Sequence, residues 1–357
     1  MKEFRDRDID RRTFLKITSG AVGAGLVGSV FGPASNAWAA KRGIVATSYG
    51  GTWQKFMMSE IIPPFQKQCD CKVTLGVGLA KEWYAKLRAS GVDNPPYDVV
   101  MTNEIWAVQE RREGFFTPLP IEKVPNLKDI NPLCRYPDDI SVIGLVQPIG
   151  LAYREDLVKN PPTSWKDLWE NPEFKGKIGL YTITNSAGFM TVLMASKIFG
   201  GSEYKLDEGF AAIRKLKPFK QVDYSGTMNV MLERGEIIIG PLDAPAVGRG
   251  RRKGLKIAFC APKEGMFMFE QTFNVTKGSK NKDLAFAYVN YVLSPEAQSK
   301  WMNKYLLAPA NMKVKIPPEL QEYIPIYGDR IKEITKWDFT AAMDRKPYMV
   351  EKWNKEM

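Results

Sequence analysis

The chain contains no histidine, and this absence limits the chemistry that its side chains can perform. A Ser-His-Asp triad, a Cys-His pair, a H-E-x-x-H zinc site and a histidine general base are all excluded. The cysteines do not show the C-x-x-C spacing typical of zinc ligands, and their pairing into disulfides cannot be read from the sequence; they are Cys69, Cys71, Cys134 and Cys260. We therefore expect no catalytic residue, no metal site and no cofactor.

The N-terminal segment has the pattern of a cleavable export signal. Residues 10–16 read DRRTFLK, and an uncharged stretch follows over residues 17–37. It ends in Ala37-Trp38-Ala39, a small-x-small sequence that suits signal peptidase. The paired arginines indicate the twin-arginine export machinery, which carries folded proteins. We expect residues 1–39 to be removed and the mature protein to work in the periplasm. The glycines of the apolar stretch disfavour a permanent membrane helix.

The net charge does not indicate a nucleic-acid-binding protein. Removal of residues 1–39 leaves 45 basic and 36 acidic residues, a net charge of +9. Basic and acidic residues alternate along most predicted helices. The densest basic run, residues 249–253, is short and contains a glycine, which is typical of a solvated turn. The mature length of about 318 residues suggests two domains with their own cores.

Strands and helices are expected to alternate along the chain. Apolar runs predict strands at 43–47, 72–76, 97–101, 142–146, 150–153, 177–180, 237–239 and 256–259. Helical periodicity and capping residues predict helices at 52–65, 81–89, 104–112, 187–199, 207–215, 227–234, 282–293 and 295–304. Alternation of this kind builds mostly parallel sheets with helices on both faces. The break before residue 142 divides the pattern into two α/β units.

Four segments of the mature chain carry a family resemblance. They are YDVV at 97–100, SWKDLWENPEFKGKI at 164–178, APKEG at 261–265 and AFAYVNYVLSPEAQ at 285–298. In this order and spacing they resemble periplasmic solute-binding proteins of the spermidine/putrescine type, extracellular solute-binding family 1. The resemblance implies an α/β fold, the two-lobed type II clamshell, in which each lobe is a mixed, mostly parallel sheet flanked by helices.

The resemblance also implies how such a protein works. A small-molecule solute is captured between the lobes and delivered to an ABC transporter permease in the inner membrane, and hinge closure needs no enzymatic residue. We expect lobe 1 to comprise residues 40–149 and 273–310 and lobe 2 residues 150–272. Residues 311–357 are expected to form helices that pack on the lobes. We expect a monomer.

Loops at the carboxyl ends of the strands face the cleft in such sheets. These loops and the strand after the APKEG turn nominate eight ligand-binding residues: Tyr49, Trp83, Glu104, Asn185, Ser186, Asp243, Phe269 and Gln271. The two carboxylates can each pair with an amine, and the three aromatic rings can enclose an apolar or cationic group. Asn185 and Ser186 begin a helix, whose free backbone N–H groups suit a carboxylate.

Several family positions depart from a polyamine site. The resemblance implies a Trp and an Asp in the strand after the APKEG turn, and here these positions hold Phe269 and Gln271. Two further family acids fall near Asn185 and Gly188. An extended dication would therefore lack most of the carboxylate partners that the resemblance implies. We predict a small zwitterion or monoamine, such as an amino-acid-like solute, with a true polyamine binder as the alternative.

Two other classes are weaker alternatives. A ferric-ion carrier would need a pair of tyrosines with a carboxylate, and Tyr224 has no adjacent tyrosine. An exported hydrolase would have to use Glu104 and Asp243 as a glycosidase-like pair of acids.

Overall fold

A computed structural model describes residues 42–357, so the predicted export signal at residues 1–39 lies outside the described residues. Residues 42–357 fall within one compact unit. This unit contains two large hydrophobic cores. The first gathers buried residues from Ile44 to Val146 and from Met266 to Ile334, and the second gathers mainly residues from Ile149 to Cys260 and from Trp337 to Trp353. Within residues 42–357, no helix is long and apolar enough to cross a membrane.

The first core is built from helices packed on strands. Its helices are α2 (Gly51–Phe56), the π-helix η1 (Met57–Ile61), α3 (Ile62–Cys69), α11 (Lys282–Val292) and α12 (Pro295–Tyr305). Its short strands are β1 (Gly43–Ser48), β2 (Lys72–Val77), β3 (Val99–Thr102) and β11 (Ala308–Pro309). Helix α4 (Ala80–Ser90) and strand β4 (Phe116–Thr117) belong to a smaller third cluster. Helix α5 (Glu104–Arg112) contributes Ile105 and Val108 to the second core. Three short 3-10 helices, η2 (Pro125–Asp129), η3 (Pro132–Cys134) and η4 (Pro137–Asp139), cover one side.

The second core has its own strands and helices. The strands are β6 (Gly179–Tyr181), β7 (Lys220–Val222), β8 (Ile239–Asp243) and β9 (Ile257–Cys260). The helices are α6 (Asp167–Glu170), η5 (Pro172–Phe174), α7 (Ser186–Gly200), α8 (Leu206–Lys215), α9 (Ser225–Arg234) and α10 (Ala244–Arg252). Strands β6 and β7 form a parallel pair, and a bridge between Ile178 and Ile239 connects β6 to β8.

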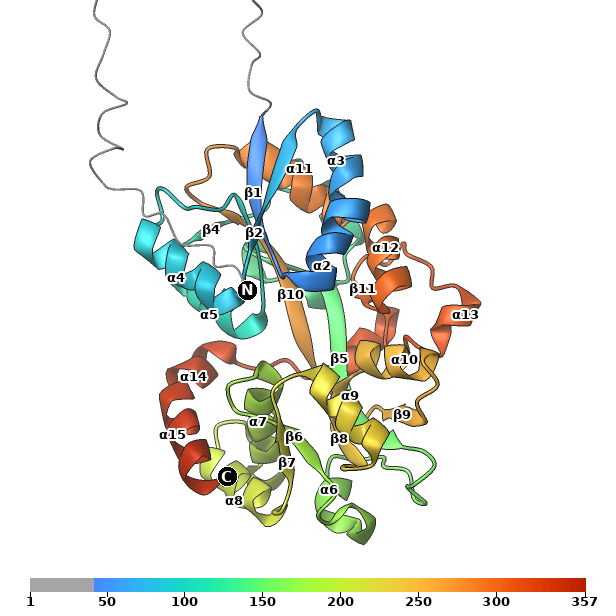
Figure 1. Ribbon diagram of the computed structural model, residues 1–357. Coiled ribbons are helices and arrows are strands. Elements are labelled where there is room, and N and C mark those ends of the chain that lie inside the picture. Colours follow the sequence, from blue (N-terminus) through green and yellow to red (C-terminus); the bar gives the residue numbers. More distant parts are fainter. Residues whose placement is uncertain (1–41) are drawn as a thin grey trace, which may run out of the picture. The chain divides into compact units, whose positions relative to one another are not determined.

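Two long strands carry the chain between the cores (Figure 1). They are β5 (Val142–Arg154) and β10 (Phe267–Thr276), and they pair with each other in antiparallel register. Most of the nine-stranded sheet follows the order β11-β5-β10-β3-β1-β2, while β8 and β9 pair with the second half of β5. The same sheet therefore enters both cores, and its crossing strands are the hinge expected of the clamshell.

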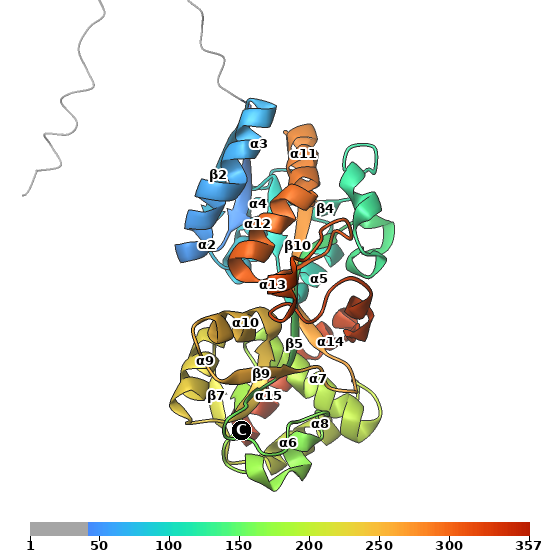
Figure 2. The same cartoon turned by 90° about the vertical axis from the view of Figure 1, so that its right-hand side faces the viewer.

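The C-terminal segment crosses between the cores a third time. Helix α13 (Pro318–Gln321) and the 3-10 helix η6 (Gly328–Glu333) contribute to the first core. Helices α14 (Phe339–Asp344) and α15 (Lys346–Glu356) contribute to the second, where α15 lies beside α8 (Figure 2). The C-terminal segment therefore contributes buried residues to both cores.

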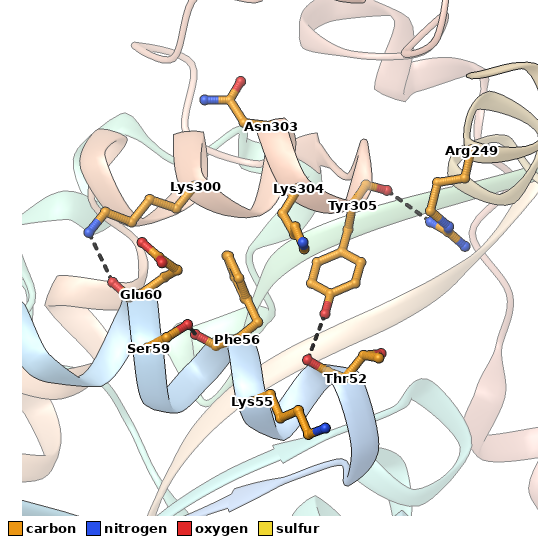
Figure 3. A pocket seen from close by; sticks show the side chains of 10 residues that line it. All are labelled: Thr52, Lys55, Phe56, Ser59, Glu60, Arg249, Lys300, Asn303, Lys304 and Tyr305. Carbon is orange, nitrogen blue, oxygen red and sulfur yellow. Dashed lines mark hydrogen bonds between the residues drawn. The ribbon is translucent and has the colours of Figure 1, made fainter. Parts of the chain in front are cut away.

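Helices α2 and η1 are joined to α12 by polar contacts (Figure 3). The Tyr305 hydroxyl donates to the Thr52 carbonyl oxygen at 3.0 Å. The Lys300 ammonium donates to the Glu60 carbonyl oxygen at 2.9 Å. These contacts join two parts of the first core that lie about 240 residues apart in the sequence.

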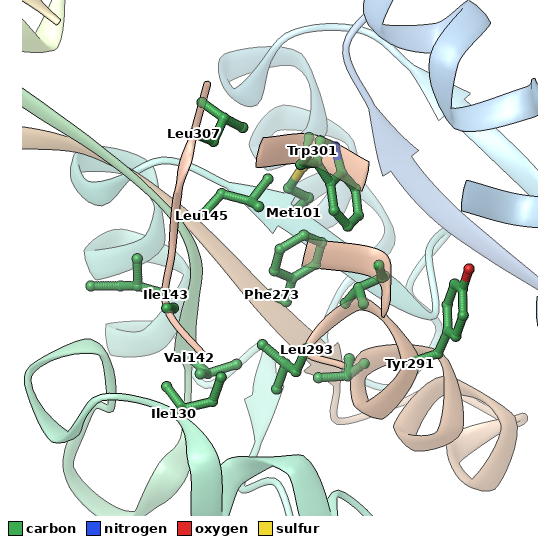
Figure 4. Packing of buried hydrophobic residues seen from close by; sticks show 14 of the residues in the cluster. Met101, Ile130, Val142, Ile143, Leu145, Phe273, Tyr291, Leu293, Trp301 and Leu307 are labelled. Atoms are coloured by element: carbon green, nitrogen blue, oxygen red, sulfur yellow. The ribbon is translucent and has the colours of Figure 1, made fainter. Parts of the chain in front are cut away.

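Phe273 occupies the centre of the first core (Figure 4). Its side chain is 1% exposed, and its ring centroid lies 6.4 Å from that of Trp301 on α12. Gly144 of β5 faces the same ring, and a Cβ atom there would come within 2.6 Å of it. The close approach of β5 to Phe273 therefore requires glycine at position 144.

Three sequence expectations need correction. The strands predicted at 142–146 and 150–153 are one strand, since Pro148 stays paired with Met268 of β10. The predicted strand 237–239 begins only at Ile239. The basic run 249–253 is the end of helix α10 and not a turn, because Asp243 caps this helix and its glycines let it lie close to its neighbours. The remaining strands and helices are confirmed within about four residues of their predicted ends, and the helix predicted at 52–65 consists of the three segments α2, η1 and α3.

We predict that Phe273→Ala lowers the free energy of unfolding by about 3–5 kcal/mol, because it removes a fully buried ring and leaves a cavity. Denaturant titration followed by tryptophan fluorescence measures the change. Phe199→Ala is the matched control, since Phe199 is 42% exposed, and its loss should be clearly smaller. Equal losses for the two variants would contradict the central role of Phe273.

Candidate ligand-binding cleft

Tyr49 follows strand β1 and separates two cavities that lie between residues of the two cores. The first, of about 370 Å³, is named the hinge cavity and is lined by Tyr49, Thr52, Trp53, Gln147, Arg249, Gln271, Tyr305 and Leu307. The second, of about 480 Å³, is named the α7 cavity and is lined by Tyr49, Leu79, Ala80, Lys81, Asn103, Ile105, Trp106, Thr184, Asn185, Ser186, Asp223, Tyr224, Lys346 and Val350. Each volume suits a small organic molecule.

The hinge cavity contains polar atoms without partners. Gln271 on β10 is 7% exposed, and its side-chain oxygen accepts no hydrogen bond. The indole N–H of Trp53 on α2 is also buried without an acceptor. A buried polar atom that stays unpaired costs about 1–3 kcal/mol. A ligand that supplies both a donor and an acceptor would recover this cost.

Arg249 brings a positive charge to the hinge cavity from helix α10. One guanidinium nitrogen donates to the Tyr305 carbonyl oxygen at 2.8 Å, and another lies 3.9 Å from Asp243 Oδ1. Tyr305 ends α12 in the first core, whereas α10 belongs to the second. The guanidinium therefore connects the two halves of the cleft.

The α7 cavity combines a helix N-terminus with two lysines. Asn185 caps α7 by accepting from the Ala187 N–H at 2.8 Å. Lys346 on α15 lies with its ammonium 4.8 Å from the Trp106 ring centroid, and burial lowers the pKa of this lysine. Lys81 lines the opposite wall. The positive groups favour an anionic part of a ligand in this cavity.

Glu104 is the buried carboxylate of the cleft. It is the first residue of α5 and is fully buried; its neighbours Asn103 and Ile105 line the α7 cavity. Its Oε2 accepts from the Glu270 N–H at 2.9 Å, and its Oε1 has no hydrogen-bond partner. Burial and the nearby Glu270 carboxylate raise the pKa of Glu104 to about 7, while the Ser186 hydroxyl acts in the opposite direction.

Glu270 connects Glu104 to a polar network on the other side of β10. The Tyr136 hydroxyl donates to Glu270 Oε2, and the Arg111 guanidinium lies 3.9 Å from the Tyr136 ring centroid. Burial raises the pKa of Glu270, whereas Tyr136 and Arg111 lower it. Tyr136 and Arg111 thus partly compensate the buried charge of Glu270.

The structure places the other predicted site residues differently. Asp243 is buried as the N-cap of α10, where its oxygens accept from the Ala246 N–H at 2.9 Å and the Ser225 hydroxyl at 2.6 Å. Trp83 is 1% exposed, and its indole N–H donates to the Gly76 carbonyl oxygen. Its ring packs against the Tyr49 ring. Phe269 is half-buried, and its ring packs nearly at right angles to Tyr181 against the second core.

The predicted residues that come together around the two cavities are Tyr49, Asn185, Ser186 and Gln271, with Glu104 directly beside them. Sequence reasoning missed Arg249, Gln147, Trp53 and Lys346. The pattern of Asp243 followed by a proline at 245 is a helix-start signal that would have placed Arg249 on a helix. No local signal marks Lys346, because its helix reaches the cleft only through tertiary packing.

Comparison with known proteins identifies the family. The family model described as bacterial extracellular solute-binding protein matches residues 60–326. The chain belongs to this family. It is 25% identical over 291 residues to spermidine/putrescine-binding periplasmic protein 1 of Haemophilus influenzae, covering 79% of this chain and 80% of that protein. It is 24% identical to the gamma-aminobutyric acid-binding protein of Pseudomonas aeruginosa, covering 91% and 94%.

Solved structures of the family share the fold. A crystal structure of an ABC transporter protein from Clostridium perfringens superposes with a TM-score of 0.77 at 26% identity, covering 88% of this chain and 99% of the other. The predicted two-lobed α/β clamshell is confirmed, and so is the function as an extracellular solute-binding protein that serves an ABC importer. The related proteins act in transport and not as enzymes.

Glu110 is a second buried carboxylate of α5, and it faces no ligand cavity described above. It is fully buried, and neither carboxylate oxygen has a hydrogen-bond partner. Burial raises its pKa to about 8, and the Thr102 hydroxyl and Arg111 offset only part of this effect. The carboxyl group is therefore mostly neutral in the folded protein at pH 7.

We predict that Glu110→Gln stabilises the protein at pH 8 and has little effect at pH 5. A pKa raised from the usual value means that stability is full at low pH and falls as pH rises toward 8. The neutral amide avoids this loss, and the gain at pH 8 should reach about 3 kcal/mol. Chemical denaturation at both pH values measures it, with the exposed Glu122→Gln as the control. A variant whose advantage is the same at pH 5 and pH 8 would contradict the buried-acid assignment.

Proposed function

We propose that the cleft binds a small amine that also carries an acidic group, such as an amino-acid-like solute. The observation that carries this proposal is Glu104, a buried carboxylate with one unpaired oxygen beside the α7 cavity. An ammonium group inserted next to Ser186 would pair with Glu104 Oε1. Burial makes such a charge pair strong and its loss costly.

The cations of the cleft support an acidic group on the same ligand. Arg249 lines the hinge cavity, and Lys81 and Lys346 line the α7 cavity. Asp223 is the one carboxylate among the lining residues of the two cavities. An extended dication such as spermidine would face more positive than negative groups. The gamma-aminobutyric acid-binding relative supports the amino-acid-like solute, and the polyamine-binding relatives keep spermidine and putrescine as the alternative.

The remaining expectations form part of the proposal. Residues 1–39 direct export by the twin-arginine machinery, and the mature protein is a monomer. Residues 40–149 and 273–310 form lobe 1, residues 150–272 form lobe 2, and residues 311–357 pack on both. The two hydrophobic cores support these boundaries, since they divide along β5 and β10.

A thermal-shift screen of the purified mature protein tests the ligand class. We predict that an amino acid with separated ammonium and carboxylate groups, such as γ-aminobutyrate, raises the melting temperature more than putrescine, spermidine or ferric citrate. A ligand at a hundredfold excess over its Kd stabilises the folded state by about 2.7 kcal/mol. A dominant shift by spermidine or putrescine would show the proposed class to be wrong.

We predict that Glu104→Gln weakens binding of the best amine ligand at least tenfold, measured by isothermal titration calorimetry. The amide keeps the shape of the side chain but removes the charge that pairs with the ammonium group. Glu122→Gln, an exposed change of the same chemistry, is the matched control. Unchanged affinity in Glu104→Gln would remove Glu104 from the site.

Ligand affinity should also depend on pH. Because the pKa of Glu104 is raised to about 7, protonation below pH 7 removes the negative charge that the ammonium group requires. We predict that affinity falls by up to about tenfold per pH unit between pH 7 and pH 5.5. The same titration with Glu104→Gln should be flat. An affinity that rises toward pH 5.5 would contradict an ionised Glu104 as the partner of the amine.

A further inference from the structure

We propose that a basic groove on the first lobe docks an acidic polypeptide segment of the membrane permease. The groove is lined by Thr52, Lys55, Phe56, Ser59, Glu60, Arg249, Lys300, Asn303, Lys304 and Tyr305, and it has a volume of about 770 Å³. This inference rests on the function as a solute-binding component of an ABC importer and is independent of the identity of the solute.

The groove lies between two helical segments (Figure 3). Positions 52, 55, 56, 59 and 60 share one face of α2 and η1, and positions 300, 303 and 304 share one face of α12. The buried Phe56 ring lies between these two rows. A trough bounded by two helices fits an extended chain segment better than a single small ion.

The charge of the groove defines the chemistry of its partner. Four basic side chains line it, and Glu60 is the one acidic side chain among them. Lys300 has nearby acceptors, namely the Glu60 carbonyl oxygen at 2.9 Å and Glu296 Oε1 at 3.5 Å. Lys55 and Lys304 are exposed and form no hydrogen bond or ion pair within residues 42–357. Two unpaired ammonium groups on a concave surface attract a partner that presents several carboxylates.

The second lobe closes one end of the groove. Arg249 comes from α10 and donates to the Tyr305 carbonyl oxygen at 2.8 Å, and the Tyr305 hydroxyl reaches the Thr52 carbonyl oxygen at 3.0 Å. The same three residues line the hinge cavity. Separation of the lobes would break the contact between Arg249 and Tyr305 and remove this wall. The groove is therefore complete only while the two lobes keep this contact.

The double variant Lys55→Gln/Lys304→Gln tests the proposal. The permease complex that this protein serves is reconstituted in proteoliposomes, and its ATPase activity is measured against the concentration of the binding protein at low salt. The solute with the largest thermal shift is present at saturation. We expect the double variant to need at least a tenfold higher concentration for half-maximal stimulation, and Lys55→Glu/Lys304→Glu to need still more.

The control is Lys128→Gln/Lys280→Gln, two exposed lysines that do not line the groove and that give the same change in net charge. The control should behave as the wild type, and all variants should retain solute affinity within twofold by calorimetry. Unchanged stimulation by Lys55→Gln/Lys304→Gln, or an equal loss in the control pair, would overturn the proposal.

Competition separates a polypeptide partner from a small anion. A hexaglutamate peptide should inhibit stimulation by the wild-type protein more strongly than inorganic phosphate at equal total charge and ionic strength. Equal inhibition by phosphate would overturn the polypeptide assignment and indicate a site for small anions.

Discussion

The structure depends on the antiparallel pairing of β5 with β10. These strands are shared by both hydrophobic cores, so the two lobes are joined by hydrogen-bonded backbone and not by a loose linker. Crossing strands can change their twist with little loss of packing, while the cores themselves are densely packed and move as units. Phe273 fixes one end of the pair in the first core, and Phe267 fixes the other end in the second. Gln147 and Gln271 lie between these ends, which places the floor of the hinge cavity on the hinge itself.

The position of the cleft on the hinge explains its unusual polar groups. Glu104, Glu270 and Gln271 are all at least nine-tenths buried, and at least one atom of Glu104 and of Gln271 has no partner. In a core that serves only for packing, such atoms would be a net cost. In a binding cleft they are recognition groups, since a solute with the matching donor or acceptor recovers the cost. The pKa of Glu104 is raised for the same reason, because burial without a positive partner disfavours the charged carboxylate. A cationic group on a solute would supply that partner.

Arg249 links three features of the molecule. It lines the hinge cavity, contacts Asp243 at the start of its own helix and donates to Tyr305 across the cleft. Through Tyr305 and Thr52 it also forms one end of the basic groove. A solute that draws Arg249 toward the hinge cavity and a partner that recognises the groove would therefore act on the same closed arrangement. The coupling needs no long-range pathway, since one side chain is common to both surfaces.

The sequence alone determined the local elements and the family, whereas tertiary structure decided the site. Alternating apolar runs and caps such as Asp243 and Asn185 fix strands and helices through nearest neighbours, so these were predictable within a few residues. The rule that strand ends face the cleft nominated Tyr49, Asn185, Ser186 and Gln271, which line the two cavities, and Glu104, which lies beside them. It could not show that Trp83 is buried in a core, that Phe269 packs against the second core, or that the Asp243 oxygens cap a helix. Lys346 and Tyr305 reach the cleft from the last third of the chain because their helices pack against distant segments. Such contacts depend on how whole surfaces pack together, and the spacing of residues in the sequence does not predict them.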